Sequence, residues 1–490
     1  MSVWQERLKK LSIETRAFIN GQYVAAADGK TFASINPATE EEIAQITECG
    51  DIEVNLAVKH ARAAFEAGVW ADLAPRARAT VLKKLAALMT EHADELALLE
   101  TIDTGKPISD CRAVDIGGSI HTVEWYAEVV DKIGDEVAPV DPKFLGLVTR
   151  QAVGVVAAVV PWNFPLMMAS WKYAPALAAG NSVILKPSEK SPLTAIRLAQ
   201  LAKEAGIPDG VFQVLPGPGT VGKALSLHMD VDCVAFTGST NVGKLIMGYG
   251  AQSNLKRVWL ELGGKSPNII FPDCPDLKKA ARSAAGGIYY NMGQVCTAGS
   301  RVLVHEDIKA EFLQHFKEAS KRYVTADPLD DKATMGPLVD SIQYEKVLDY
   351  VAKGKAQSTL IMGGESQKVD GKGYFLEPTA FETQPDDLLA TEEIFGPVLS
   401  VITFKTQEEA VAIANNTQYG LGAALWTSNL GTAHKVARKL RAGTVWVNCY
   451  DEGGDMNMPF GGFKQSGNGR DKSIHALEKY TELKSTLIKL

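Results

Sequence analysis

The hydrophobic pattern in the middle of the chain alternates between short apolar runs and longer amphipathic stretches. Residues 153–160 read Val-Gly-Val-Val-Ala-Ala-Val-Val, and such a continuous run is typical of a strand buried on both faces of a parallel sheet. Similar short runs at 182–185, 212–215 and 231–236 predict further strands, with helix-like stretches between them. This alternation predicts an α/β fold built on an open parallel sheet.

Proline and glycine mark the boundaries of one of these helices. Ser191-Pro192 predicts an N-cap followed by a first-turn proline, and Gly206 predicts the end of the same helix. A second alternating block begins after residue 261, with helices predicted near 277–290 and 308–322. Two blocks agree with the length of 490 residues, which exceeds one ordinary core and favours two or three domains.

Composition and charge narrow the function classes. A hydrophobic fraction of 46% and a charged fraction of 22% are ordinary for a soluble globular protein. The formal net charge of −7 disfavours nucleic acid and anionic membranes as partners, because no basic surplus is present to neutralise phosphates. The longest apolar run is about a third of a membrane span, and the first residues lack a basic-then-apolar signal. We therefore expect a cytoplasmic protein that binds neither nucleic acid nor membrane.

Six cysteines are spread along the chain. None belongs to a C-x-x-C pair and no histidine cluster accompanies them, so neither a metal site nor a disulfide framework is expected. Five of the six are interpreted as small buried apolar residues. These five are Cys49, Cys111, Cys233, Cys274 and Cys449.

The sixth cysteine belongs to a set of three motifs. Cys296 lies in Asn-Met-Gly-Gln-Val-Cys-Thr-Ala-Gly-Ser-Arg, Glu261 in Leu-Glu-Leu-Gly-Gly-Lys-Ser-Pro, and Asn163 in Pro-Trp-Asn-Phe-Pro. A thiol, a carboxylate and an amide are the groups needed to attack a carbonyl, stabilise the oxyanion and hydrolyse a thioester. In this order the motifs resemble the NAD(P)-dependent aldehyde dehydrogenase superfamily. The resemblance runs from Phe-Ile-Asn-Gly-Gln at 18–22 to Pro-Phe-Gly-Gly-Phe-Lys at 459–464.

The resemblance implies a fold and a division into domains. It implies the aldehyde dehydrogenase fold, in which a Rossmann-like parallel sheet binds the cofactor and a second α/β domain carries the catalytic cysteine. Residues 1–133 and 152–264 would form the NAD-binding domain, and residues 265–464 the catalytic domain. Residues 134–151 and 477–490 would form a small β oligomerisation element, which makes a homodimer or homotetramer the expected assembly.

A glycine-containing turn follows the strand predicted at 231–236. Glycine at this place lets the backbone approach a pyrophosphate, and the amides of the next helix can bind that charge. The spacing in Thr-Gly-Ser-Thr-Asn-Val-Gly differs from G-x-G-x-x-G, and most strand–glycine–helix turns bind nothing. The aldehyde dehydrogenase family has this looser variant, so the resemblance implies that Gly238, Ser239 and Gly243 contact the cofactor.

Two charged residues in Leu-Lys-Pro-Ser-Glu match positions that hold the adenosine ribose in the family. They are Lys186 and Glu189, which without the resemblance would equally read as solvated loop residues. A carboxylate accepts two hydroxyl hydrogen bonds well but repels a 2′-phosphate, so NAD is the expected cofactor, with NADP possible but weaker. The resemblance also assigns Glu393 and Phe395 to the nicotinamide ribose and Trp162 to cofactor binding.

The same resemblance implies a mechanism. The Cys296 thiol needs help to ionise, which we expect from backbone amides of a loop after a helix. Asn163 and the Cys296 amide would hold the oxyanion, hydride would leave to the nicotinamide, and Glu261 would activate water against the thioester. Lys172 matches a position that assists proton movement. The presence of Cys296 and Glu261 disfavours an inactive structural relative, and Glu261 as a base disfavours a CoA-acylating one.

Substrate preference depends on a further set of residues. The resemblance places four apolar or small residues along the aldehyde tunnel, although two of them would otherwise read as ordinary core; they are Met168, Trp171, Val295 and Thr297. Residues 464–473 resemble the bacterial branch that oxidises ω-amino, guanidino and γ-glutamylamino aldehydes in polyamine and arginine catabolism. We expect an acidic tunnel mouth that binds a cationic end group, formed by Asp115, Asp451, Glu452 and Asp455. The alternative is that these acids are surface charge and the enzyme is a broad-specificity or other semialdehyde dehydrogenase.

Overall fold

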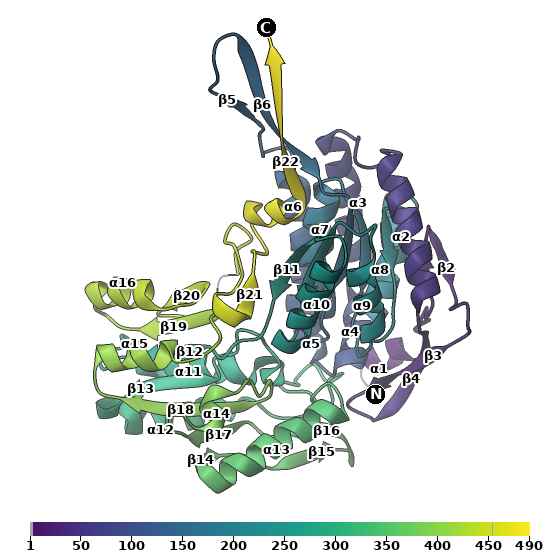
Figure 1. The fold of residues 1–490 in the computed structure, drawn as a ribbon. Helices are drawn as coiled ribbons and strands as arrows, with labels where there is room; N and C mark the ends of the chain where they lie inside the picture. Colours follow the sequence, from purple (N-terminus) through teal and green to yellow (C-terminus); the bar gives the residue numbers. More distant parts are fainter. Residues whose placement is uncertain (1–2, 453) are drawn as a thin grey trace.

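Two large sheets form the body of the protein in the computed structural model, which describes residues 3–452 and 454–490 (Figure 1). The first sheet has eight strands, and its five inner strands are parallel. In spatial order the strands are β2 (Gln22–Val24), β1 (Ala17–Ile19), β9 (Phe212–Val214), β8 (Ser182–Lys186), β7 (Val155–Val159), β10 (Cys233–Thr237), β11 (Arg257–Glu261) and β21 (Gly467–Asn468). The parallel sheet predicted from the apolar runs is therefore confirmed.

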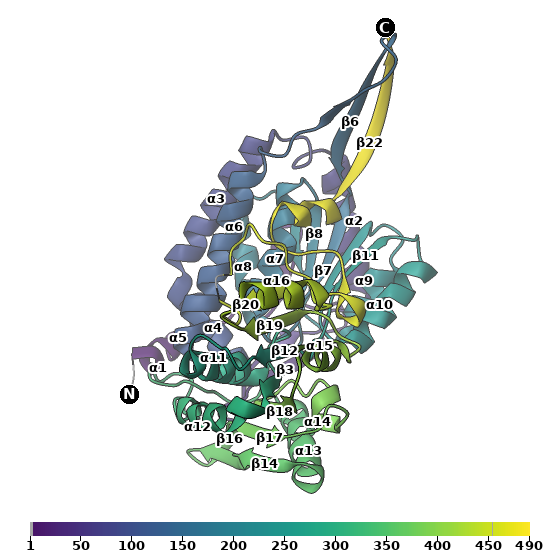
Figure 2. The same cartoon turned by 90° about the vertical axis from the view of Figure 1, so that its left-hand side faces the viewer.

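The continuous apolar run of β7 has a direct structural reason. Val155 and Ala157 pack with one group of helices, whereas Val156 and Ala158 pack with another on the opposite face. Because successive strand residues point to opposite faces, a sheet covered on both sides needs apolar residues at every position. Figure 2 shows the two groups on either side of the sheet. They are α2 (Asp51–Glu66), α9 (Gly219–Leu227) and α10 (Thr240–Gln252) on one face, and α3 (Pro75–Glu91), α4 (Ala93–Thr104), α6 (Gly117–Val129), α7 (Pro165–Ala178) and α8 (Leu193–Ala205) on the other.

The second sheet has seven strands, and only β14 at its edge is antiparallel to its neighbour. In spatial order these are β14 (Thr359–Met362), β17 (Thr379–Glu382), β18 (Val398–Phe404), β13 (Arg301–His305), β12 (Pro267–Ile270), β19 (Gly422–Trp426) and β20 (Thr444–Val447). Its helices are α11 (Leu277–Tyr289), α12 (Lys309–Ser320) and α13 (Ser341–Gln357) on one face, with α15 (Gln407–Asn415) and α16 (Leu430–Lys439) on the other. The helices predicted near 277–290 and 308–322 are confirmed as α11 and α12.

A three-stranded antiparallel sheet projects from the body (Figures 1 and 2). It is formed by β5 (Glu136–Ala138), β6 (Phe144–Ala152) and β22 (Thr481–Lys489), and the register of β22 with β6 runs from Thr481 opposite Ala152 to Lys489 opposite Phe144. Its surface exposes Val137, Leu483 and Leu487. The β ribbon expected from the resemblance is thus present, although residues 477–479 belong to a 3₁₀-helix (Ile474–Lys479) and not to the strand.

Two boundaries differ from the sequence-based expectation. The first sheet also takes in β21, which lay outside the residues expected to build it. Helix α8 begins at Leu193, after Pro192, and Ser191 does not cap it. The cap comes from a distant residue, because the Asp103 carboxylate accepts a 2.9 Å hydrogen bond from the Leu193 amide. Residues 1 and 2 of the expected first domain lie outside the described residues.

The remaining elements are short. They are α1 (Val3–Leu8), β3 (Thr31–Asn36), β4 (Glu41–Thr47), α5 (Ile108–Asp110), a π-helix (Cys111–Ile116), β15 (Ser366–Val369), β16 (Lys372–Leu376) and α14 (Leu388–Thr391), with 3₁₀ turns between several elements. In the part of the chain that the structure describes, no helix has the length and apolar character needed to cross a bilayer.

Candidate active site

Four adjacent strands of the first sheet end beside predicted site residues. β7 leads into the loop of Asn163, β8 ends at Lys186, β10 is followed by Gly238, and β11 ends at Glu261. The chain runs from β7 to β8 and β9 in one direction and returns to β10 and β11 on the other side of β7. Such a reversal in strand order opens a crevice at the carboxyl ends of a parallel sheet, which is where these folds bind ligands.

The other predicted site residues lie in segments just before strands of the second sheet. Gly264 lies before β12, Cys296 before β13 and Glu393 before β18. The Asn163 side chain, after β7 of the first sheet, donates to the Gln294 carbonyl before β13 of the second sheet at 2.9 Å. Among the second-sheet segments, the Gly264 amide donates to Glu393 at 2.9 Å. The candidate site therefore lies where the carboxyl ends of one sheet face the amino ends of the other.

Cys296 occupies a tight turn whose approach is conformationally unusual. Asn291, Met292 and Gly293 have φ angles of 46°, 54° and 70°, all in the left-handed region. The turn around Cys296 is closed by a 3.0 Å hydrogen bond from the Ala298 amide to the Val295 carbonyl. Strained backbone of this kind persists only where surrounding contacts fix it, and it is often found at functional sites.

The surroundings of Cys296 disfavour its thiolate. Burial raises the pKa of Cys296 far above its ordinary range, and the carboxylates of Glu261, Asp451 and Glu393 raise it further. Only the Thr297 amide, which donates to the sulfur, acts in the opposite direction. The help expected from a loop amide is present at Thr297, but burial and the three acids have the larger, opposite effect on the pKa. The thiol therefore needs a base to remove its proton.

Asn163 is fixed directly against the loop of the cysteine. It is 6% exposed, its Nδ2 donates to the Gln294 carbonyl at 2.9 Å, and its own carbonyl accepts from Asn291 Nδ2 at 3.0 Å. An amide nitrogen carries two hydrogens, and the Gln294 carbonyl takes one of them. The second N–H is the group that can donate to an oxyanion formed next to Cys296.

Glu261 presents a buried carboxylate with unsatisfied oxygens. It is 5% exposed, and neither oxygen has a hydrogen-bond partner among the described residues. Burial raises the pKa of Glu261 well above 4.5, and Asp471 raises it further, while Lys172 and Lys479 lower it. A carboxylate that costs free energy to keep charged is a good proton acceptor, and such groups are typical of catalytic sites.

Lys172 belongs to a buried cluster that the sequence did not reveal. Lys172 on α7 and Lys479 both form ion pairs with Asp471, and all three side chains are at most 4% exposed. Asp471 has a lowered pKa despite its burial, because both lysines bind its carboxylate. Lys172 is separated from Asp471 by 299 residues, so no local pattern could have joined them.

The residues predicted to hold the adenosine ribose lie together at the end of β8. Lys186 is 4% exposed and its ammonium lies 3.3 Å from a Glu189 oxygen, whereas the Glu189 side chain is 43% exposed. Burial lowers the pKa of Lys186, and Glu189 partly offsets this. One buried cation and one accessible carboxylate are suited to hydrogen bonds with a pair of hydroxyls.

The glycine turn after β10 has a packing role in addition to any contact with phosphate. A Cβ on Gly243 would lie 2.6 Å from Leu262 Cδ2, and one on Gly238 would lie 2.4 Å from the Phe236 ring. Ser239 caps α10 by accepting a 3.3 Å hydrogen bond from the Val242 amide. The helix start is therefore held close to the sheet, with its first amides at the edge of the crevice.

The residues predicted at the nicotinamide end also converge. The Trp162 and Phe395 rings meet edge to face, with centroids 5.3 Å apart, and Phe395 has a left-handed φ of 60°. Glu393 accepts the Gly264 amide, which lowers its pKa, but burial has the larger effect and raises it. Glu393 lies close enough to Cys296 for its carboxylate to raise the pKa of the thiol.

The residues predicted along the substrate path differ in burial, and two further aromatic residues lie beside them. Met168 is 5% exposed, whereas Trp171 is half-buried and packs against Phe460 with ring centroids 5.2 Å apart. Val295 is half-buried beside the cysteine. Tyr290 was not predicted; its hydroxyl is buried without a partner among the described residues.

Thr297 and the acidic loop meet beside the nucleophile. The Thr297 hydroxyl donates to Asp451 at 3.1 Å, and Asp451, Glu452 and Asp455 are all exposed. Lys472 is the unexpected neighbour of this loop, since both Asp451 and Asp455 act on its pKa. The predicted acids are thus near the site, but a cation accompanies them.

Asp115 does not lie at a solvent-facing mouth, contrary to expectation. It is fully buried on the π-helix, where it forms an ion pair with Lys106. The Glu100 carboxylate is also fully buried; burial raises the pKa of Glu100 well above 4.5, and the nearby Asp115 raises it further. No local pattern in the sequence indicated this pairing, and a carboxylate held by a buried lysine is not free to bind a substrate cation.

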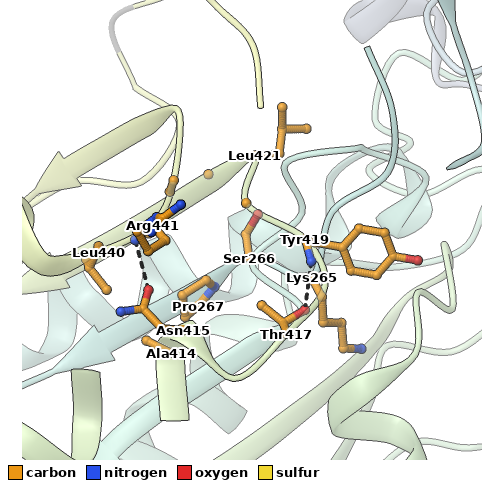
Figure 3. A pocket seen from close by; sticks show the side chains of 14 residues that line it. Lys265, Ser266, Pro267, Ala414, Asn415, Thr417, Tyr419, Leu421, Leu440 and Arg441 are labelled. Atoms are coloured by element: carbon orange, nitrogen blue, oxygen red, sulfur yellow. Dashed lines mark hydrogen bonds between the residues drawn. The ribbon is translucent and has the colours of Figure 1, made fainter. Parts of the chain in front are cut away.

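A small pocket next to the site is lined by none of the residues predicted to bind the cofactor or substrate (Figure 3). It is lined by residues from three segments, 265–267, 414–423 and 440–442. Its wall includes Lys265, which is 2% exposed and whose ammonium has no partner in the described part of the chain. Burial, with Arg301 nearby, lowers the pKa of Lys265 to about 7. Among the described residues no group of three His, Cys, Asp or Glu side chains could hold a metal ion.

Comparison with known proteins identifies the family to which this geometry belongs. The model of the aldehyde dehydrogenase family matches residues 23–486. The chain belongs to the aldehyde dehydrogenase family. It is 51% identical, over 100% of its length and 99% of the relative, to the NADP/NAD-dependent aldehyde dehydrogenase PuuC of Escherichia coli (strain K12).

Solved structures of relatives share the fold of this aldehyde dehydrogenase. A γ-glutamyl-γ-aminobutyraldehyde dehydrogenase from Burkholderia cenocepacia J2315 is 64% identical, with a TM-score of 0.99 and 99% of each chain covered. A variant of the indole-3-acetaldehyde dehydrogenase AldA of P. syringae, in complex with NAD+ and IAA, is 57% identical, with a TM-score of 0.98 and 99% of each chain covered. The protein is an NAD(P)-dependent aldehyde dehydrogenase, and NAD is its cofactor.

The residues of this aldehyde dehydrogenase fit NAD. At the end of β10, Thr237 Oγ1 is buried without a hydrogen-bond partner among the described residues, beside the start of α10. The Lys186 ammonium and the accessible Glu189 carboxylate lie at the end of β8, the second strand from β10. An unpaired hydroxyl, a cation and an accessible carboxylate near the ends of these strands are groups that a dinucleotide can use.

Proposed function

We propose that the enzyme oxidises its aldehyde to a carboxylic acid through a covalent intermediate on Cys296. The observation that carries this proposal is that Asn163 is bonded directly to the Gln294 carbonyl, two residues before Cys296. This contact supports the role of Asn163 as an amide donor to an oxyanion formed at Cys296. Glu261 supplies the third group, a buried carboxylate with two unpaired oxygens.

Attack begins with the removal of the thiol proton. Because burial raises the pKa of Cys296, Glu261, whose own pKa is raised, is the base that receives this proton. The sulfur then bonds to the carbonyl carbon, and the carbonyl oxygen takes up the negative charge. The free N–H of Asn163 and the Cys296 amide donate to that oxygen.

Bound NAD supplies the acceptor for the two electrons that leave with the aldehyde hydrogen as hydride, and a thioester remains on Cys296. Lys186 and Glu189 hold the adenosine ribose, while Trp162, Glu393 and Phe395 position the other end. Gly238, Ser239 and Gly243 bring the first turn of α10 to the pyrophosphate. The side chains thus fix the acceptor relative to the sulfur, which lowers the entropic cost of reaching a reactive geometry.

Hydrolysis of the thioester returns the enzyme to its starting state. After releasing the thiol proton, Glu261 accepts a proton from water, the water oxygen bonds to the carbonyl carbon, and the carbon–sulfur bond breaks. The carboxylic acid leaves, and the Cys296 sulfur takes up the proton from Glu261, which restores the thiol and the carboxylate. Lys172 with Asp471 provides the route by which the proton leaves Glu261, because their buried ion pair lies beside it.

The substrate proposed is an ω-amino, guanidino or γ-glutamylamino aldehyde of polyamine or arginine catabolism. The acids Asp451, Glu452 and Asp455 support a charged end group, and a relative of 64% identity is named for γ-glutamyl-γ-aminobutyraldehyde. A broad-specificity enzyme is the second candidate. The half-buried Trp171 against Phe460 favours it, because an aromatic wall accepts apolar aldehydes.

Steady-state oxidation of four aldehydes with NAD distinguishes the two candidates. The set is aminobutyraldehyde, guanidinobutyraldehyde, γ-glutamylaminobutyraldehyde and hexanal, each at low and high salt, with Cys296→Ala as the blank. Charged aldehydes should have KM values roughly tenfold to a hundredfold below that of hexanal, and salt should raise those values. If hexanal has the highest kcat/KM and salt changes nothing, the acids are surface charge and the broad-specificity candidate holds.

We propose that the ribbon of β5, β6 and β22 forms an oligomerisation element of a homodimer or homotetramer in the cytoplasm. Its exposed Val137, Leu483 and Leu487 support this assignment, since apolar side chains on a projecting sheet gain stability when covered. The first sheet and the second sheet correspond in the same proposal to the NAD-binding and catalytic domains. Sedimentation of the full chain and of a Leu483→Lys, Leu487→Lys variant tests the assembly, which the two charges should weaken.

A further inference from the structure

Lys472 is a buried lysine that forms no ion pair with any of the described residues. The residue is 8% exposed, and within the described residues its ammonium forms neither an ion pair nor a hydrogen bond. Its contact is with an aromatic face, since the ammonium lies 5.7 Å from the centroid of the Trp171 ring. Trp171 is one of the residues along the predicted substrate path, so the unpaired cation lies on that path.

The backbone holds Lys472 in place. Lys472 and Ser473 have φ angles of 59° and 50°, which only fixed surroundings can maintain for residues other than glycine. The Ser473 amide donates to the Met456 carbonyl at 2.8 Å, and the Asp471 and Phe460 backbones exchange two hydrogen bonds of 2.7 Å. The segment of Lys472 is thereby tied to the loop that carries Asp451 and Asp455.

One of the acids near Lys472 is bonded to the residue that follows the nucleophile. Asp451 is bound to the hydroxyl of Thr297, the residue directly after Cys296. Asp451 and Asp455 both act on the Lys472 ammonium, but neither approaches within ion-pair distance. An ammonium beside a carboxylate, with space left between the two, matches the opposite charges of an α-amino acid.

We propose that Lys472 binds the carboxylate of an aldehyde whose far end is an α-amino acid, while Asp451 or Asp455 binds its ammonium. This inference rests on the proposed function and narrows its substrate class. A γ-glutamylamino aldehyde has such an end group. A simple ω-aminoaldehyde does not, and its single cation gains from the acids but is repelled by Lys472.

The test compares Lys472→Met, Lys472→Arg and the wild type. Met keeps an aliphatic stem over the Trp171 ring but removes the charge, and Arg restores it. The readout is kcat/KM for γ-glutamylaminobutyraldehyde and for aminobutyraldehyde, each divided by the value for hexanal. Lys472→Met should lower the first ratio tenfold to a hundredfold, mainly through KM, and raise the second ratio. Lys30→Met, an exposed lysine far along the chain, is the matched control and should change neither ratio.

A second measurement uses the wild type alone, so that the proposal stays testable if a variant fails to fold. The acid γ-glutamylaminobutyrate and its α-carboxamide compete against hexanal, and the amide should inhibit at least tenfold more weakly. Equal inhibition by both compounds, or equal falls of both ratios in Lys472→Met, means that Lys472 only packs on Trp171, and the inference is wrong. Absence of oxidation of any aldehyde by the wild type contradicts the proposed function instead.

Discussion

Gly264 leaves no room for a side chain beside the predicted nucleophile. A Cβ on Gly264 would lie 2.3 Å from the Cys296 carbonyl oxygen and 3.4 Å from Leu421 Cβ. The obstacle is backbone, which cannot rotate away as the end of a flexible side chain can. Gly264→Ala must therefore displace the backbone of Cys296, or its own segment, by roughly 1 Å, the difference from ordinary van der Waals contact.

The displacement should reduce turnover strongly. A misplacement of about 1 Å between reacting groups costs on the order of a hundredfold in rate, so kcat of Gly264→Ala should fall about a hundredfold. Gly263→Ala is the informative neighbour, because its Cβ would meet the Glu393 carboxylate at 2.2 Å, the end of a side chain that can move. Its kcat should fall less, on the order of tenfold or below. Gly219→Ala, with nothing within 4 Å, is the control and should behave as the wild type.

Three measurements make the outcome decisive. The first is kcat with NAD, the second is the rate at which iodoacetamide alkylates Cys296, and the third is the melting temperature by calorimetry. Gly264→Ala should change the first two while the protein remains folded at the assay temperature. A folded Gly264→Ala variant with wild-type kcat and alkylation rate would show that the loop of Cys296 tolerates the methyl group and that the reasoning is wrong.

Four further substitutions test the roles of other residues. Cys296→Ser should lower turnover by several orders of magnitude while circular dichroism shows an unchanged fold; substantial activity of Cys296→Ala would contradict covalent catalysis. Glu261→Gln should lower steady-state turnover, and a rapid-quench burst of NADH that persists would assign Glu261 to hydrolysis, whereas loss of the burst would assign it to thiol ionisation as well. Glu189→Gln should improve kcat/KM with NADP, since repulsion of a 2′-phosphate is on the order of 1–4 kcal/mol; equal efficiency of the wild type with both cofactors would refute the role of Glu189. Lys479→Met removes a cation that lowers the pKa of Glu261. Because the base acts only when it is deprotonated, the rise of kcat with pH should move to higher pH. An unchanged pH profile of kcat would exclude an influence of Lys479 on Glu261.

The sequence predicted the parts of the fold that depend on local pattern. Strands β7 and β8 are recognisable because helices cover both of their faces, which demands apolar residues throughout. The helix α11 is recognisable because one of its faces is buried and its N-cap, Asp276, accepts the Lys279 amide at 2.7 Å. The prediction that Ser191 caps α8 is wrong, because the Asp103 carboxylate, which belongs to α4, accepts the hydrogen bond from the first amide of α8.

The remaining features depend on residues that are far apart in the chain. The ion pairs of Asp471 with Lys172 and Lys479, and the contact of Gly264 with Glu393, have no local signature. Asp115 is a residue for which the sequence suggested a role that the structure does not support. An acid in a net-acidic chain reads as surface charge or as a ligand for a cation, but here Lys106 lies nine residues away and both side chains are buried together. Only the tertiary structure decides between such partners.

The edge strand β21 has a consequence for the order in which the enzyme is built. Its residues, Gly467 and Asn468, pair with β11 at Leu260 and Glu261, across about two hundred residues of intervening chain. During synthesis the other strands of the first sheet are complete once residue 261 has emerged, whereas this edge and Asp471 arrive only after the second sheet has been made. Closing such a long loop is a late and slow event in folding. A partly synthesised or partly refolded chain can therefore hold its nucleotide crevice while the base that hydrolyses the thioester is still exposed to water.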